Sequence, residues 1–287
     1  MSQSMNNTFS GAGLGLRRAL VGPFQSYGDL SPVQFMEIAP ENWITVGGQS
    51  GRDLRAFAEQ YPMVLHGLSL SIGGPDDLNE TFVKAVKKFK KEINSPLYTE
   101  HLTYCTDGGQ LYDLMPIPFT QEAADYVVER ILRVQDILGE KIGMENASFY
   151  LPQPGSEMSE IEFLNYVLTQ SDCLLHLDVN NIYVNSVNHH YDPSEFLKQL
   201  PGERIAYIHI AGHYNEAEDL IVDTHGADVI DRVWQLLDQT YELYGVHPTL
   251  LERDFNFPPV VDLLKEVSHI DQIQQKHTHP NNQQKQA

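Results

Sequence analysis

The sequence predicts a single-domain α/β protein with the architecture of a (β/α)₈ TIM barrel. Apolar, β-rich runs recur along the chain, segments with helical periodicity separate them, and a length of 287 residues suits about eight such units. Strands that alternate with amphipathic helices favour a parallel sheet, because a parallel crossover needs a connection long enough for a helix. A doubly wound open sheet is the alternative, but its Gly-rich phosphate-binding turn has only one weak candidate, the run GAGLGLR.

Each predicted element can be placed in order along the chain. The strand runs lie at residues 11–17, 35–43, 63–72, 98–104, 141–149, 173–183, 204–213 and 248–257. The helical segments lie at residues 76–93, 120–138, 156–169, 192–200 and 227–244. In the second helical segment, Val127 and Val128 lie four and three residues before Ile131, which places the three on one face of a helix. We expect the barrel domain to span residues 11–271, between a flexible N-terminus at 1–10 and a disordered polar tail at 272–287.

Composition and charge exclude several classes of partner. The chain has 19 Lys and Arg against 39 Asp and Glu, a formal net charge of −20, whereas nucleic-acid-binding proteins usually carry a basic surface. No stretch approaches the ~20 apolar residues that cross a bilayer, and the N-terminus has no signal-peptide pattern. We therefore expect a cytoplasmic protein without nucleic-acid or membrane partners. Cys105 and Cys173 form no CxxC pair and are expected to be reduced and partly buried.

Polar side chains that can bind metals interrupt the strand runs at or near their carboxyl ends. In a barrel these ends meet at one mouth, where active sites lie. A single buried histidine is usually a hydrogen-bonded core residue, but the same interruption in six strands favours one shared polynuclear site. The candidate ligands are His66, His101, Glu145, Asp178, Asn180, His209, Asp223, His225 and Glu252.

The residue types narrow the choice of metal. Imidazole and carboxylate without thiolate suit zinc, manganese or iron. Glu145 and Glu252 could each bridge two ions, which lie roughly 3.5–4 Å apart in two-metal sites. Asp223 and His225 share one face of an extended segment, as do Asp178 and Asn180, although Asn180 could instead orient Asp178. Candidates for orienting ligands or contacting the substrate are His213, Glu100, Asn146, His176, Asn181, Arg253 and Asp254. Of these, His213 could also be a ligand, and Glu100 could replace its neighbour His101.

The motifs together resemble one known family. In chain order they are HG at 66–67, EH at 100–101, EN at 145–146, HLDVNN at 176–181, HIAGH at 209–213, DTHG at 223–226 and ER-D at 252–254. With the early segment MEIAPENW at 36–43, this series resembles the multinuclear non-heme iron-dependent oxidases, the MNIO family, over residues 11–267.

The resemblance implies a TIM barrel related to xylose isomerases and endonuclease IV. It implies two or three iron ions in a mixed Fe(II)/Fe(III) state, held at the nine candidate ligand positions, with dioxygen as co-substrate. The implied reaction is oxidation of a residue, chiefly cysteine, in a ribosomally made precursor peptide. Many members of the family act with a small partner protein that presents the peptide.

Two other functions fit the same residues. A metal-dependent hydrolase or isomerase would hold zinc or manganese with these ligands and activate water. A non-catalytic barrel that binds metal or peptide would have a saturated metal shell and consume no oxygen. Metal identity and oxygen consumption discriminate between the three readings.

Overall fold

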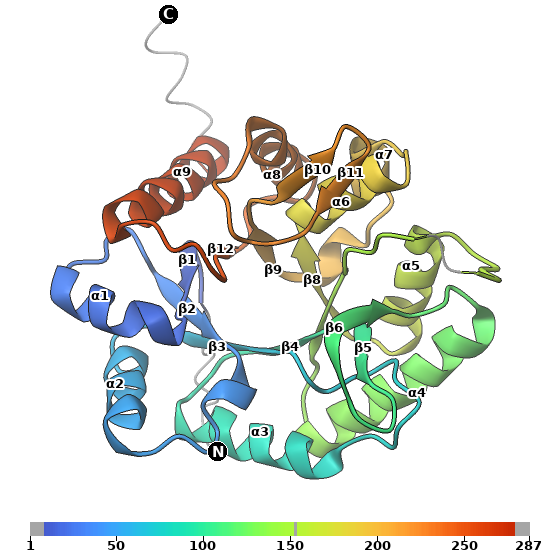
Figure 1. The fold of residues 1–287 in the computed structure, drawn as a ribbon, viewed down its shortest axis with the longest axis horizontal. Helices are drawn as coiled ribbons and strands as arrows, with labels where there is room; N and C mark the ends of the chain where they lie inside the picture. The colour runs from blue at the N-terminus through green and yellow to red at the C-terminus, as the bar shows by residue number, and fades with distance from the viewer. Residues whose placement is uncertain (1–8, 152–153, 279–287) are drawn as a thin grey trace, which may run out of the picture.

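The computed structural model describes residues 9–151 and 154–278 and contains a closed parallel barrel. Its strands follow the order β1-β12-β9-β8-β7-β4-β3-β2 around the barrel (Figure 1). They are β1 (Ala12–Gly15), β2 (Phe35–Ile38), β3 (Met63–Gly67), β4 (Tyr98–His101), β7 (Gly143–Glu145), β8 (Leu174–Asp178), β9 (Ile205–Ile210) and β12 (Thr249–Leu251). Each strand lies inside one of the eight predicted runs, so the predicted fold class is confirmed.

Helices surround the strands on the outside (Figure 1). They are α1 (Val21–Tyr27), α2 (Gly48–Ala58), α3 (Glu80–Glu92), α4 (Gln121–Leu138), α5 (Glu160–Gln170), α6 (Val179–Asn188), α7 (Pro193–Leu197), α8 (Asp231–Tyr244) and α9 (Val260–Thr278), with short 3-10 turns η1 (Arg18–Leu20), η2 (Pro40–Asn42) and η3 (Gly202–Arg204). Local sequence sets several of their ends. Ser159 and Glu162 form a capping box at the start of α5, and Gly139 ends α4 in the left-handed conformation.

Alternate strand residues fill the barrel interior. Side chains two positions before the polar residues at the strand ends point the same way, so they form the layer beneath them. This layer is a separate, fully buried apolar cluster that contains Phe35, Val64, Tyr207 and Leu250. At Gly13 on β1 a Cβ atom would lie 2.5 Å from the Phe35 ring, so glycine leaves the room that this ring occupies.

The structure corrects the predicted ends of several elements. The strand runs extended past the true strand ends, and the run at 173–183 contains a whole turn of helix, because α6 begins at Val179 directly after β8. Asn180 therefore lies on a helix, and the extended alternation predicted for Asp178 and Asn180 does not hold. At the C-terminus α9 continues to Thr278, seven residues beyond the predicted barrel boundary at 271. The rest of the predicted tail, and residues 1–8 of the predicted flexible N-terminus, lie outside the described residues.

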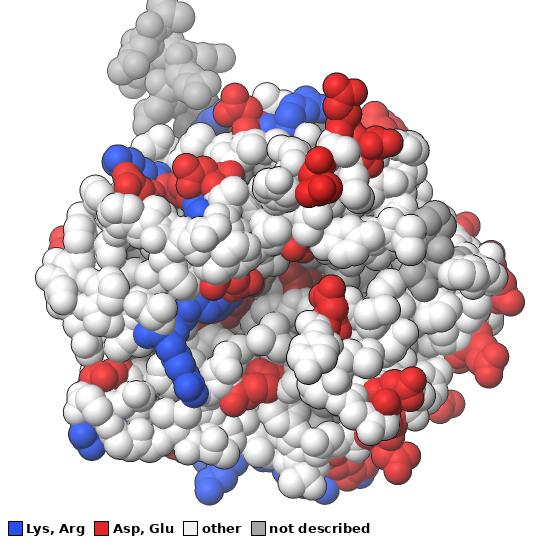
Figure 2. All heavy atoms as spheres, in the orientation of Figure 1, with Lys and Arg blue, Asp and Glu red and all other residues white. Residues whose placement is uncertain are grey.

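Two β-hairpins are inserted after barrel strands. One is β5 (Thr103–Thr106) with β6 (Gln110–Pro116), and the other is β10 (Tyr214–Ala217) with β11 (Leu220–Val222). Both follow the carboxyl end of the preceding strand, so they flank the mouth of the barrel. Figure 2 shows this face hollowed near its centre, with acidic side chains in the hollow and basic side chains along one edge. Among the described residues, no helix has the length and apolar character needed to cross a membrane.

Candidate metal centre

Strand pairing places predicted ligands from neighbouring strands side by side. His101 on β4 is the register partner of Glu145 on β7. Asp178 on β8 is the register partner of His209 on β9. These four residues end or nearly end their strands, so the register of the parallel barrel brings them to one mouth, as predicted from the sequence.

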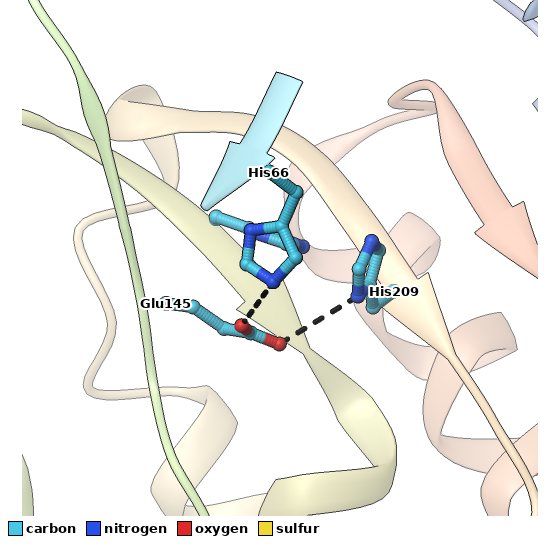
Figure 3. A group of neighbouring side chains, drawn as sticks. His66, Glu145 and His209 are labelled. Carbon is cyan, nitrogen blue, oxygen red and sulfur yellow. Dashed lines mark ion pairs between the residues drawn. The ribbon is translucent and has the colours of Figure 1, made fainter. Parts of the chain in front are cut away.

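Glu145 lies among three histidines. Its Oε2 atom is 3.0 Å from His66 Nε2 and 3.2 Å from His101 Nε2. Its Oε1 atom is 3.6 Å from His209 Nδ1. Figure 3 shows the carboxylate facing His66 with one oxygen and His209 with the other. Glu145 would therefore be available as a metal ligand together with His66, His101 and His209.

Glu252 has the same relation to two other histidines. Its Oε2 atom is 2.9 Å from His209 Nδ1 and 3.1 Å from His225 Nδ1. One ligand atom each from Glu145, Asp178, His209 and Glu252 lies within 4.8 Å of the other three. All four residues are buried. They make a second group of ligands that shares Glu145 with the first.

Asp223 forms the centre of a third group, beside α6. Its Oδ1 atom is 2.7 Å from His225 Nε2 and accepts a hydrogen bond from Asn180 Nδ2 at 2.9 Å. His213 Nδ1 is 2.7 Å from Asn180 Oδ1. All nine predicted ligands thus lie in one cluster of three groups, with His213 at its edge. Their role as ligands stays a prediction.

Hydrogen bonds on the far side of the rings fix how the histidines face the cluster. His66 Nδ1 lies 2.8 Å from Thr99 Oγ1, and His101 Nδ1 lies 2.9 Å from the Gly67 carbonyl oxygen. In His209 the order is reversed, since Nε2 lies 2.6 Å from Glu37 Oε2 and leaves Nδ1 facing the centre. Partners of this kind orient metal-binding imidazoles and select the nitrogen that faces the metal.

The cluster concentrates negative charge in a buried site. For Asp178, burial and then the neighbouring Glu145 raise the pKa well above its usual value. For Glu145, burial opposes ionisation, but the imidazoles of His176, His101 and His66 outweigh it and hold the pKa well below its usual value. Carboxylates that share a buried site in this way are stabilised by a multivalent cation.

Unpaired ligand atoms show that the residues fit a bound metal. Several nitrogen and oxygen atoms of the cluster are buried without a hydrogen bond among the described residues, which would be costly in an apolar interior. They are His66 Nε2, Glu145 Oε2, both ring nitrogens of His176, Asp178 Oδ2, His209 Nδ1, His213 Nε2, His225 Nε2 and Glu252 Oε2. Ligand atoms of Glu145, Asp178, His209 and Glu252 lie within 4.8 Å of one another, as ligands around an ion do, and nitrogen with oxygen donors suits iron, zinc or manganese.

Three of the predicted outer residues lie against the ligands. Asn146 Nδ2 donates to the Asp178 carbonyl at 2.9 Å, and its Oδ1 accepts from the Asp178 amide at 2.9 Å. Asn181 Nδ2 donates to the Asn146 carbonyl at 3.0 Å, which ties the start of α6 to the end of β7. His176 is fully buried, and one of its ring nitrogens lies within 4.8 Å of ligand atoms of His66, Glu145 and His209. Its ring stacks on Tyr207 with 4.1 Å between centroids.

The remaining residues that were predicted to orient ligands or contact the substrate lie either at the mouth of the barrel or away from the cluster. Asp254 lies at the mouth, where it contacts Arg17 and His225. Glu100 points away from the cluster and accepts a hydrogen bond from Tyr98, so His101 is the member of this pair that faces Glu145. The Arg253 guanidinium pairs with Asp228 and Glu266, so Arg253 does not join the cluster.

Sequence reasoning missed Glu37 and Arg17. Glu37 is fully buried and accepts hydrogen bonds from the Tyr207 hydroxyl and His209 Nε2, both at 2.6 Å. Arg17 contacts Glu252 at 2.9 Å and Glu37 at 3.5 Å. The signal for Glu37 was present, since this glutamate interrupts the apolar run FMEI as the predicted ligands interrupt theirs.

Sequence comparison matches nearly the whole chain to one family. Residues 11–275 match the family described as "RiPP precursor modification enzyme MbnB/TglH/ChrH". A UPF0276 protein of Nitrosospira multiformis is 59% identical over 265 residues, which cover 92% of this chain and 93% of that protein. A UPF0276 protein of Alcanivorax borkumensis is 57% identical over 274 residues, which cover 93% and 92% respectively.

Solved structures with the same fold are distant in sequence. A xylose isomerase-like TIM barrel protein from Mycobacterium smegmatis in complex with magnesium matches with a TM-score of 0.64 at 10% identity, over 95% of this chain and 98% of that chain. Endonuclease IV from Thermus thermophilus matches with a TM-score of 0.59 at 15% identity, over 91% and 98%. These similarities show the barrel fold alone.

Proposed function

Because this chain belongs to the family of RiPP precursor modification enzymes MbnB/TglH/ChrH, we propose that it is a multinuclear iron oxidase that uses dioxygen to modify cysteine in a ribosomally made peptide. Family membership supports a precursor peptide as the substrate. The observation that supports a multinuclear centre is that Glu145 and Glu252 each lie between two of the three groups of candidate ligands. This arrangement suits two or three ions in one site.

Iron, when bound, would supply the redox capacity to oxidise the peptide with dioxygen as the oxidant. The protein contributes position and charge. Thr99 and Glu37 hold the rings of His66 and His209 from behind, while the carboxylates of Glu145 and Glu252 lie between ligand groups. Their negative charge in a buried site would favour the more highly charged ferric state.

The substrate would approach the third ligand group. Side-chain exposure is 13% at His225, 12% at His101 and 10% at Asp223 but 0% at His209, so the cluster meets solvent at the first three residues. A cavity of about 200 Å³ opens there, with Leu68 and Tyr150 in its walls. A peptide side chain that enters this cavity reaches the cluster beside Asp223 and His225. We propose that a small partner protein presents the peptide at this mouth.

Metal analysis with oxygen uptake tests the proposal. Protein purified without added metal is analysed by plasma mass spectrometry and Mössbauer spectroscopy, and oxygen uptake is then followed with a cysteine-containing precursor peptide encoded beside its gene. We expect two or three irons for each chain, partly antiferromagnetically coupled, and oxygen consumption that depends on the peptide. Stoichiometric zinc, with no oxygen uptake after iron is supplied, would instead support a metal-dependent hydrolase.

A further inference from the structure

A second cavity lies beside the segment 147–149, which follows β7, on the side away from the cavity at the barrel mouth. It has a volume of about 710 Å³ and lies between the start of α5 and the end of α6. Aromatic rings form much of its wall. Phe149 stacks on His189 with 4.0 Å between centroids, and Tyr191 stacks on Phe196 with 5.3 Å between centroids. The aromatic walls suit the aliphatic stem of a long side chain.

One carboxylate lies in this apolar wall without a cation. Glu160 Oε1 accepts a hydrogen bond from Asn185 Nδ2 at 3.0 Å. Its Oε2 atom is buried, the Tyr191 hydroxyl interacts with the carboxylate, and the described lining contains no lysine or arginine. Burial raises the pKa of Glu160 to about 7, more than the hydrogen bonds from Asn185 and Tyr191 lower it. A cation beside Oε2 would remove the cost of burying this charge.

We propose that the cavity binds a lysine or arginine side chain of the precursor peptide, with its charged end at Glu160 and its aliphatic stem along the aromatic walls. This inference rests on the proposed peptide substrate. Cationic groups bind the faces of aromatic rings as well as carboxylates, and arginine stacks on such rings readily. The net charge of −20 would also attract a basic segment of peptide from solution.

Hydrogen bonds connect this cavity to the metal centre. Asn185, the partner of Glu160, also accepts from the Phe149 amide and donates to the Ala147 carbonyl, each at 3.0 Å. Between these residues Ser148 donates to Asp223 Oδ2 at 2.9 Å. The segment 147–149 therefore has the reacting site on one side and the cavity on the other. A peptide anchored at Glu160 would cross this segment and place a nearby residue at the mouth.

Small probes can test the site without turnover. Binding of Nα-acetyl-arginine methylamide and Nα-acetyl-lysine methylamide to the metal-loaded protein is measured by ligand-observed NMR, with Nα-acetyl-norleucine methylamide as the uncharged analogue. Glu160→Gln keeps an acceptor for Asn185, so this variant should fold. The control is Glu195→Gln, because Glu195 lines the same cavity but is largely exposed and paired with Lys198.

We expect a charged probe to bind the native protein and the Glu195→Gln variant equally, and to bind Glu160→Gln about tenfold more weakly, since a hydrogen bond to a charged group is lost. The norleucine probe should bind both variants alike. Equal binding of the charged probes to native protein and Glu160→Gln, or no saturable binding to native protein, would overturn the site. Because the assay reports binding alone and needs no turnover, it separates failure of this site from failure of the oxidase proposal.

Discussion

At the scale of single residues, Glu145 should be essential for holding more than one ion. Glu145→Gln keeps the shape of the side chain but removes the charge that faces His66, His101 and His209. We expect the metal content to fall from two or three ions to at most one for each chain, measured by plasma mass spectrometry. Glu100→Gln is the matched control, because Glu100 is a buried glutamate on the adjacent strand that faces Tyr98. An equal loss of metal from both variants would contradict this assignment.

Glu37 should act on the metal through His209. Glu37→Gln keeps an acceptor for His209 Nε2 but removes the negative charge behind the ring. We expect metal affinity to fall about 10–100-fold, as for other carboxylates that orient a metal-binding histidine. Competition with a chelator of known affinity measures this change. Tyr207→Phe, which removes only the hydroxyl group bound to Glu37, should change affinity far less; unchanged affinity in Glu37→Gln would exclude the positioning role.

The buried carboxyl of Glu160 makes stability depend on pH. Its pKa is raised from 4.5 to about 7, so the folded protein binds this proton more tightly than the unfolded chain does. The free energy of unfolding should therefore fall as pH rises between these values, by at most about 3 kcal/mol from this group. Glu160→Gln should be closer to native stability at pH ~5 and gain relative to it at pH ~8, by urea unfolding. The same difference at both pH values would contradict the shift.

The sequence predicts most residues of the candidate metal centre because burying a charged side chain in a strand needs a compensating interaction. His66, Asp178 and His209 interrupt apolar runs, and the structure brings them together. The sequence could not decide whether Glu100 or His101 faces the candidate metal centre. The two residues are adjacent on one strand and point to opposite sides, so the choice depends on how the strand is oriented in the barrel. The Glu160 cavity could not be predicted, since an acidic residue in the first turn of a helix is normally exposed there.

At the scale of elements, the eight strands and five predicted helices are confirmed because their periodicity is strong. The change from β8 to α6 was missed because VNNIY has the β-branched and aromatic residues of a strand. In the structure Asp178 caps α6, with its side chain accepting from the Asn181 amide at 2.8 Å. Asp178 thus ends a strand, starts a helix and faces the candidate metal centre. The secondary-structure propensity of the surrounding residues does not predict this combination of roles.

Packing inside the barrel should make β1 intolerant of a single methyl group. In Gly13→Ala the new Cβ would lie 2.5 Å from the Phe35 ring, which forms the layer below the metal centre. We expect a loss of about 1–3 kcal/mol in the free energy of unfolding, the usual cost of overpacking a core. Gly22→Ala on α1 is the control, because alanine favours a helix and the new Cβ meets no other described atom within 4 Å, its chain neighbours and the backbone of its own helix aside. Equal stability of the two variants would show that the interior can rearrange.

At the scale of the whole molecule, the barrel collects buried carboxylates where its strands end. Glu37, Glu145, Asp178 and Glu252 are all nearly inaccessible, while Arg17 is a guanidinium that contacts two of them. Buried charges without enough partners oppose folding. The same arrangement that favours cations should therefore weaken the protein when they are removed.

Metal removal should lower the thermal stability of the entire domain. Ions that bind only the folded chain stabilise it by about 4 kcal/mol when present at ~1,000 times their dissociation constant. For a chain of this size that corresponds to a melting temperature on the order of 10 °C higher. We expect chelation to remove this increment in calorimetry and anaerobic Fe(II) to restore it, with a much smaller change in Glu145→Gln. An unchanged melting temperature in protein shown by metal analysis to be free of ions would contradict this prediction. Protons would then neutralise the buried carboxylates in place of the ions, and Asp178, whose pKa is raised, would be the first of them to bind a proton.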